Sequence, residues 1–159
     1  MKKFLNMAYW IVLVFYSYLL VDTVFLARDV RRSINIVPFD MISEQGFTIN
    51  VWGNVLMFIP LGVYFADNMK QFRFWKVLGG IIGTSLAIEV LQYIFKCGAS
   101  DIDDLILNTI GGLLGIFIYL LLKSISKSKE QVHIAISILS IIVGVPVILL
   151  VIIIFAYNH

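Results

Sequence analysis

Residues 77–122 read VLGGIIGTSLAIEVLQYIFKCGASDIDDLILNTIGGLLGIFIYLLL. Two apolar runs, 77–95 and 105–122, lie on either side of a short segment that carries three aspartates. A helix that spans a bilayer needs about 20 mostly apolar residues. The stretch therefore predicts two neighbouring membrane-spanning helices that are joined by a short polar loop.

The whole chain has the composition of a membrane protein. Its 159 residues are 60% hydrophobic and 14% charged, whereas soluble domains carry about 25% charged residues. The continuous apolar runs differ from the alternating segments of a membrane β-barrel. We predict an all-α, polytopic membrane protein with short loops and a single domain over residues 1–159, embedded in the lipid bilayer. The five predicted spans are Phe4–Val21, Ile49–Ala66, Val77–Phe95, Leu105–Leu122 and Ile134–Ala156.

The cationic residues predict the orientation of the chain. With the amino terminus in the cytoplasm and the carboxyl terminus outside, eight cations lie on the cytoplasmic side and four lie outside, as the positive-inside rule favours. The cytoplasmic group is Lys2, Lys3, Lys70, Arg73, Lys76, Lys123, Lys127 and Lys129, and the outer group is Arg28, Arg31, Arg32 and Lys96. The first apolar run is long and lacks a small-residue cleavage site, so we expect a retained helix rather than a signal peptide.

This topology brings polar residues of three spans to one depth. Glu89 lies about 9 Å from the outer end of the third span, at 1.5 Å per residue. Gln92 shares its helix face. Ionisable groups at membrane depth are costly and usually mark a functional site. We predict an outward-facing, ligand-binding polar cleft, with Glu89 as the best catalytic candidate. Its residues are Asn54, Glu89, Gln92, Asp101, Asp104 and Asn108.

Structural roles compete with this hypothesis. Ser100 or Asp101 could cap the fourth span, since both side chains accept hydrogen bonds from free helix amides. Asn54 and Asn108 could join helices, as amides often do in membranes. A carboxylate at the depth of Glu89 is harder to explain by structure alone, because it must be paired, protonated or hydrated.

Small residues predict close helix packing. Gly79-xxx-Gly83 and Gly111-xxx-Gly115 form ridges that allow helix backbones to approach one another. We expect the third and fourth spans to pack through these ridges, which would hold Glu89 near Asn108.

The sequence lacks the residues that several kinds of catalysis and binding require. His133 is expected in a loop and His159 ends the sequence, so zinc hydrolysis and Ser-His catalysis have no support. Cys97, which we expect in the outer loop, is the only cysteine, and internal disulfides are therefore excluded. The net charge of +2 is spread over loops, which argues against a nucleic-acid partner.

Two further hypotheses use the acidic residues. Asp101, Asp103 and Asp104 could hold Mg²⁺ or Ca²⁺ against a lipid phosphate, with Glu89 as acid or base. Alternatively, Glu89 could carry a proton in a small transporter, although no inverted repeat is evident.

Several motifs in the same order resemble the VanZ-like family of bacterial membrane proteins. They are Ile36-Val-Pro38-Phe39, Asn54-Val-Leu-Met-Phe-Ile-Pro60-Leu-Gly62, Glu89-xx-Gln92 and Ser100-Asp-Ile-Asp-Asp-xxx-Asn108-Thr-xx-Gly111. The likeness covers about residues 35–115. Where many relatives have an arginine before the serine, this chain has Ala99.

The resemblance implies a place in the bacterial cell membrane and a role in low-level resistance to lipoglycopeptides such as teicoplanin. It implies no particular reaction. Joined to the polar residues, it suggests that the predicted cleft engages the antibiotic or a lipid-linked cell-wall intermediate.

Overall fold

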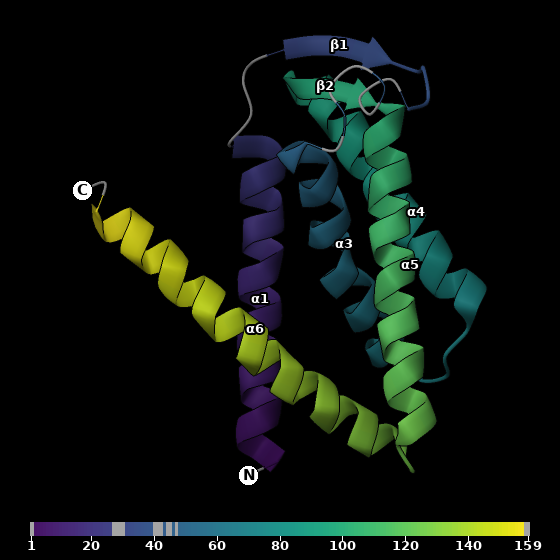
Figure 1. Cartoon of the computed structure of the whole chain (residues 1–159), viewed down its shortest axis with the longest axis vertical. Coiled ribbons are helices and arrows are strands. Elements are labelled where there is room, and N and C mark those ends of the chain that lie inside the picture. Colours follow the sequence, from purple (N-terminus) through teal and green to yellow (C-terminus); the bar gives the residue numbers. More distant parts are fainter. Residues whose placement is uncertain (1, 27–30, 40–42, 44–45, 47, 158–159) are drawn as a thin grey trace. The chain divides into compact units, whose positions relative to one another are not determined.

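The computed structural model of the chain describes residues 2–26, 31–39, 43, 46 and 48–157 (Figure 1). Arg28, one of the outer cations counted above, and His159 lie outside the described residues. The chain divides into two compact units, one built around α1 and α6 and the other from residues 21–121. The elements are α1 (Lys2–Val21), the π-helix η1 (Asp22–Leu26), β1 (Arg31–Asn35), α3 (Ile49–Asn68), α4 (Phe74–Phe95), β2 (Cys97–Asp101), α5 (Ile102–Ile125) and α6 (Lys129–Tyr157).

The prediction of five membrane-spanning helices is confirmed. Among the described residues, α1, α3, α4, α5 and α6 are each long and apolar enough to cross a bilayer. Each of them contains one of the five apolar stretches named above. The most apolar part of α6 has none of its residues buried. Such a helix is stable in lipid, where apolar side chains need no protein cover.

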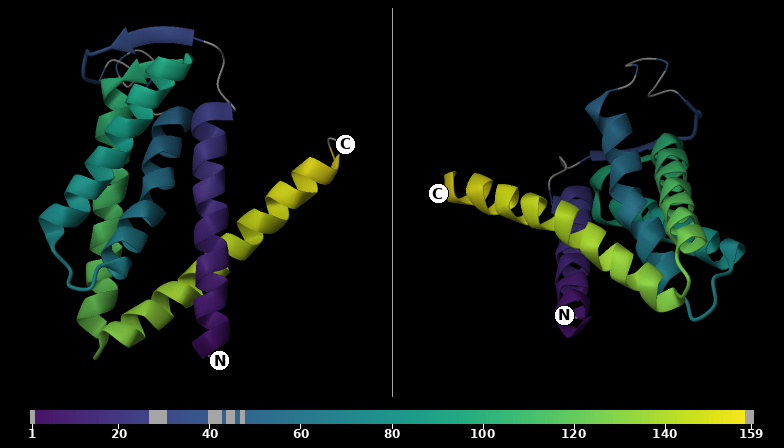
Figure 2. Two further views of the ribbon diagram at one scale, coloured as in Figure 1. Left: turned by 180° about the vertical axis from the view of Figure 1, so that it is seen from behind. Right: turned by 60° about the horizontal axis from the view of Figure 1, so that its bottom comes forward.

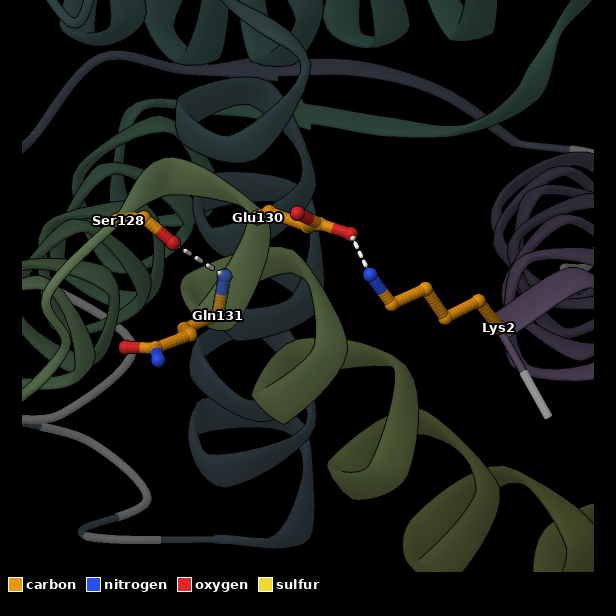
Figure 3. A network of polar contacts seen from close by, with 4 residues as sticks. All are labelled: Lys2, Ser128, Glu130 and Gln131. Carbon is orange, nitrogen blue, oxygen red and sulfur yellow. Dashed lines mark hydrogen bonds and ion pairs between the residues drawn. The ribbon is translucent and has the colours of Figure 1, made fainter.

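In the first unit, α1 and α6 are in contact at Gly144 and at an ion pair near their first residues. A Cβ added to Gly144 would lie 2.5 Å from Cγ1 of Val12, so a larger residue at this position would require Val12 to move. Near the start of α6, Lys2 forms an ion pair with Glu130 (Figure 3). His133 lies within α6 rather than in the predicted loop, and its ring stands 4.6 Å from that of Tyr9. The loop prediction was wrong because α6 begins before its apolar run.

In the second unit, α3, α4 and α5 lie beside one another (Figure 2). The closest packing joins α5 to α3. A Cβ on Gly111 would lie 2.1 Å from the carbonyl oxygen of Val55, and one on Gly115 would lie 2.2 Å from that of Ile59. The prediction that α4 packs through Gly79 and Gly83 was wrong. A Cβ on either glycine would meet no atom outside its own helix backbone within 4 Å. The helix α4 instead contacts α5 with Ile81, which lies against Gly112.

Two short strands, which the sequence did not predict, lie across one end of this unit (Figure 1). They are parallel, and the register pairs Asn35 of β1 with Asp101 of β2. Parallel strands need a long connection, which α3 and α4 supply here. The ribbon therefore holds β1 beside the start of α5.

Candidate functional site

Buried polar side chains gather where α4 ends and α5 begins. Five of the predicted residues are between 0% and 5% exposed: Glu89, Gln92, Asp103, Asp104 and Asn108. These groups are shielded from bulk water, and buried polar atoms without hydrogen-bond partners cost about 1–3 kcal/mol each. Their arrangement therefore depends on the partners that the protein provides.

Asp101 caps helix α5 and is itself held by Glu89. The Asp101 Oδ1 atom accepts a hydrogen bond from the backbone N–H of Asp103 at 2.9 Å, which is the geometry of an N-cap. The backbone N–H of Asp101 donates to Oε2 of Glu89, also at 2.9 Å. The capping role considered for Asp101 is therefore confirmed. Glu89 has a specific structural contact, because its carboxylate joins α4 to the N-cap residue of α5.

Carboxylates at the start of α5 also bind the end of β1 and the segment that follows it. The Nδ2 atom of Asn35 lies 3.4 Å from Oδ2 of Asp101 and donates to it. The backbone N–H of Phe39 donates to Oδ1 of Asp103. Sequence reasoning missed Asn35, although it stands directly before the Ile36-Val-Pro-Phe motif. These contacts depend on the strand register, which no local pattern in the sequence reveals.

Two amides connect the helices. Asn54 on α3 donates to Oδ1 of Asp104 on α5, and Asn108 on α5 donates to Oγ of Ser85 on α4 at 2.9 Å. The helix-joining role considered for both asparagines is confirmed. Asn108 meets α4 at Ser85, one helical turn before Glu89, so the network extends along α4. Ser85 was also missed, although it lies four residues before Glu89.

In the part of the chain that the structure describes, the side chain of Gln92 uses only its donor in a hydrogen bond. Its Nε2 atom donates to the carbonyl oxygen of Val24 in η1 at 3.0 Å. Its Oε1 atom is buried and has no hydrogen-bond partner among the described residues. An amide oxygen in that position can accept a hydrogen bond from a ligand or from a bound water.

The geometry gives little support to a metal site at the aspartates. Asp101 accepts a hydrogen bond from Asn35 at the end of β1, Asp103 accepts one from Phe39, and Asp104 accepts one from Asn54. Within the described parts of the chain, no group of three or more His, Cys, Asp and Glu side chains is placed to hold a metal ion. Binding of Mg²⁺ or Ca²⁺ at Asp101, Asp103 and Asp104 therefore stays a prediction.

One buried acid lies outside the network. Asp67, near the end of α3, is 3% exposed and was not singled out from the sequence. Nearby in the sequence, Phe72 stacks on Tyr119 of α5 with ring centroids 5.3 Å apart. These contacts fasten the α3–α4 connection to α5, at the end of α3 away from Asn54.

The network thus links three membrane helices and a loop through carboxylates and amides. In the described residues it contains no nucleophile paired with a histidine, because His133 belongs to the other unit. Its groups can accept hydrogen bonds, carry negative charge or exchange a proton. An open cleft remains a prediction.

Comparison with known proteins is consistent with these motifs. A family model described as VanZ/LLP1 matches residues 4–123. "Protein VanZ" from Enterococcus faecium is 38% identical over 89 residues, which cover 56% of this chain and 53% of that protein. The match thus spans about half the length of that relative. No solved structure matches the chain. Because the family model covers most of the sequence, this multi-pass membrane protein belongs to the VanZ/LLP1 family.

Proposed function

We propose that this protein gives low-level protection against teicoplanin-type lipoglycopeptides at the outer face of the membrane. The proposal combines membership of the VanZ/LLP1 family with the network of buried polar residues. In this proposal the network engages either the antibiotic or a lipid-linked envelope intermediate. Either event would lower the amount of drug bound at the cell surface.

One observation carries the proposal. Acidic and amide side chains from α3, α4 and α5 converge at one end of the unit, and those from α4 and α5 include Glu89, Asp104 and Asn108, whose burial is costly. Capping and helix joining account for single contacts. They do not require Glu89, since a neutral side chain could accept the Asp101 N–H without the cost of burying a charge. The retained carboxylate is therefore the group to which we assign a functional role.

The proposed orientation places this network outside the cell. In that orientation, Lys70, Arg73 and Lys76 in and beside the α3–α4 connection lie in the cytoplasm. A drug that does not enter the cytoplasm could then reach the network from the outer leaflet.

Selectivity between two antibiotics tests the proposal. Expression in a susceptible Gram-positive host is expected to raise the inhibitory concentration of teicoplanin more than that of vancomycin. The physical reason is that the acyl chain of teicoplanin concentrates it at the lipid surface. The measurement is the inhibitory concentration of each drug, at equal protein level, against a host with the empty vector. Equal protection against both drugs would contradict a mechanism at the membrane surface, and no protection would refute the proposed function.

A further inference from the structure

The loop after β1 exposes apolar side chains. We call residues 36–39 (Ile36-Val37-Pro38-Phe39) the apolar tip. Ile36 is 77% exposed, and Val37 and Phe39 are each 56% exposed. These side chains lie outside the helices, so helix packing does not explain them. Adjacent exposed apolar residues usually mark a surface that contacts lipid or a partner.

The backbone of the apolar tip is fixed by the polar network. The N–H of Val37 donates to Oδ1 of Asn35 at 3.0 Å, while Asn35 itself donates to Asp101. The N–H of Phe39 donates to Asp103, which is only 1% exposed. The tip is therefore held at Phe39 by the carboxylate of Asp103 and at Val37 by the amide of Asn35, which is itself bonded to Asp101.

Phe39 also adopts a strained backbone conformation. Its φ angle is 64°, in the left-handed region that favours glycine. Its ring is more than half exposed, so burial of the ring does not compensate for the strain. Strain of this kind persists where the surrounding structure imposes it, and it often accompanies function. The exposed phenyl ring of Phe39, carried on a strained backbone, is an example of this association.

The hydrogen bonds of the apolar tip indicate its depth in the membrane. Asp101 and Asp103 flank Ile102, which is the first residue of the membrane-spanning helix α5. The tip is bonded to Asp103 directly and is linked to Asp101 through Asn35. It therefore lies at the level where the bilayer begins. Apolar side chains such as Phe and Leu enter this interfacial region in segments that lie along a membrane surface. We propose that the apolar tip inserts into the interface between lipid headgroups and acyl chains on this side of the membrane. This proposal does not depend on the antibiotic role.

The depth of a spin label tests the insertion. The full chain with Cys97→Ser and Val37→Cys would carry a nitroxide label and be reconstituted into phosphatidylcholine–phosphatidylglycerol vesicles. We expect frequent collisions with oxygen, which concentrates in lipid, and few collisions with a water-soluble nickel chelate. The control is Lys70→Cys in the same background. Lys70 is exposed in the polar α3–α4 connection, and its label should show the opposite pattern.

Each alternative has a distinct outcome. A Val37 label that collides mainly with the nickel chelate would place the tip in water and overturn the proposal. Shielding from both reagents would indicate cover by a second copy of the chain, which also overturns it. Phe39→Gly is a second variant, expected to fold because glycine relieves the positive φ angle. With Phe39→Gly, the Val37 label should shift toward water, and an unchanged depth would contradict insertion through the ring.

Discussion

Replacement of Glu89 by glutamine is expected to abolish protection against teicoplanin and to leave the protein folded at its normal level. The amide oxygen of glutamine can still accept the backbone N–H of Asp101 that Oε2 of Glu89 accepts now. The variant loses only the negative charge and the capacity to take up a proton. Its unfolding free energy should change by about 1 kcal/mol or less, because a hydrogen bond to a neutral acceptor is weaker than one to a carboxylate. The measurements are the inhibitory concentration of teicoplanin, the amount of protein in the membrane, and thermal unfolding in detergent.

Two further variants separate chemistry from packing. Glu89→Ala leaves the Asp101 N–H without its acceptor, so it should lose about 1–3 kcal/mol of stability as well as protection. Asn108→Ala removes the hydrogen bond to Ser85. It should lower protection and cost about 0.6–2 kcal/mol, the range for polar contacts between membrane helices. Full protection by the Glu89→Gln protein would remove the carboxylate from the mechanism and reduce the network to a structural element.

The second large effect is expected at the glycine seam between α3 and α5. In Gly111→Ala, the new Cβ would lie 2.1 Å from the carbonyl oxygen of Val55. A backbone oxygen cannot rotate away as a side chain can, so the two helices must separate. We expect a loss of about 3 kcal/mol, the upper part of the usual range for overpacking. The measurement is the midpoint of thermal unfolding of the purified protein.

Gly79→Ala is the matched control for this substitution. It makes the same chemical change on α4, but its Cβ would meet no atom within 4 Å. Alanine favours the helix over glycine by up to about 1 kcal/mol, so this variant should be neutral or slightly more stable. Similar losses in both variants would contradict the assignment of the close contact to α5 and α3.

The five helices and several buried polar residues could be predicted from the sequence. Apolar runs of membrane length have few alternatives in lipid, because backbone polar groups must bond within the segment. The burial of Glu89 and Asn108 follows from their place inside such runs. The N-cap of α5 could also be predicted locally, since Asp101 stands directly before that helix.

Other features depend on tertiary structure and could not be predicted in this way. The β1–β2 ribbon joins two segments of five residues that are far apart in the chain, and neither shows a clear strand pattern. A small-residue motif indicates that a close contact is possible but does not identify the partner. Gly79-xxx-Gly83 and Gly111-xxx-Gly115 look alike, yet only the second meets another helix backbone. The role of Asp103 in holding Phe39 depends on the ribbon and could not be predicted from the sequence.

The most direct test of a network that acts outside the cell is the labelling of single cysteines in intact cells. In a Cys97→Ser background, Ser43→Cys places a thiol beside the network, because the backbone N–H of Ser43 donates to the carbonyl oxygen of Phe39. Lys70→Cys places one in the α3–α4 connection. With a membrane-impermeant maleimide, the account predicts labelling of Ser43→Cys without lysis, and labelling of Lys70→Cys only after permeabilisation. The reverse pattern would place the network in the cytoplasm, away from an extracellular drug, and would contradict the account.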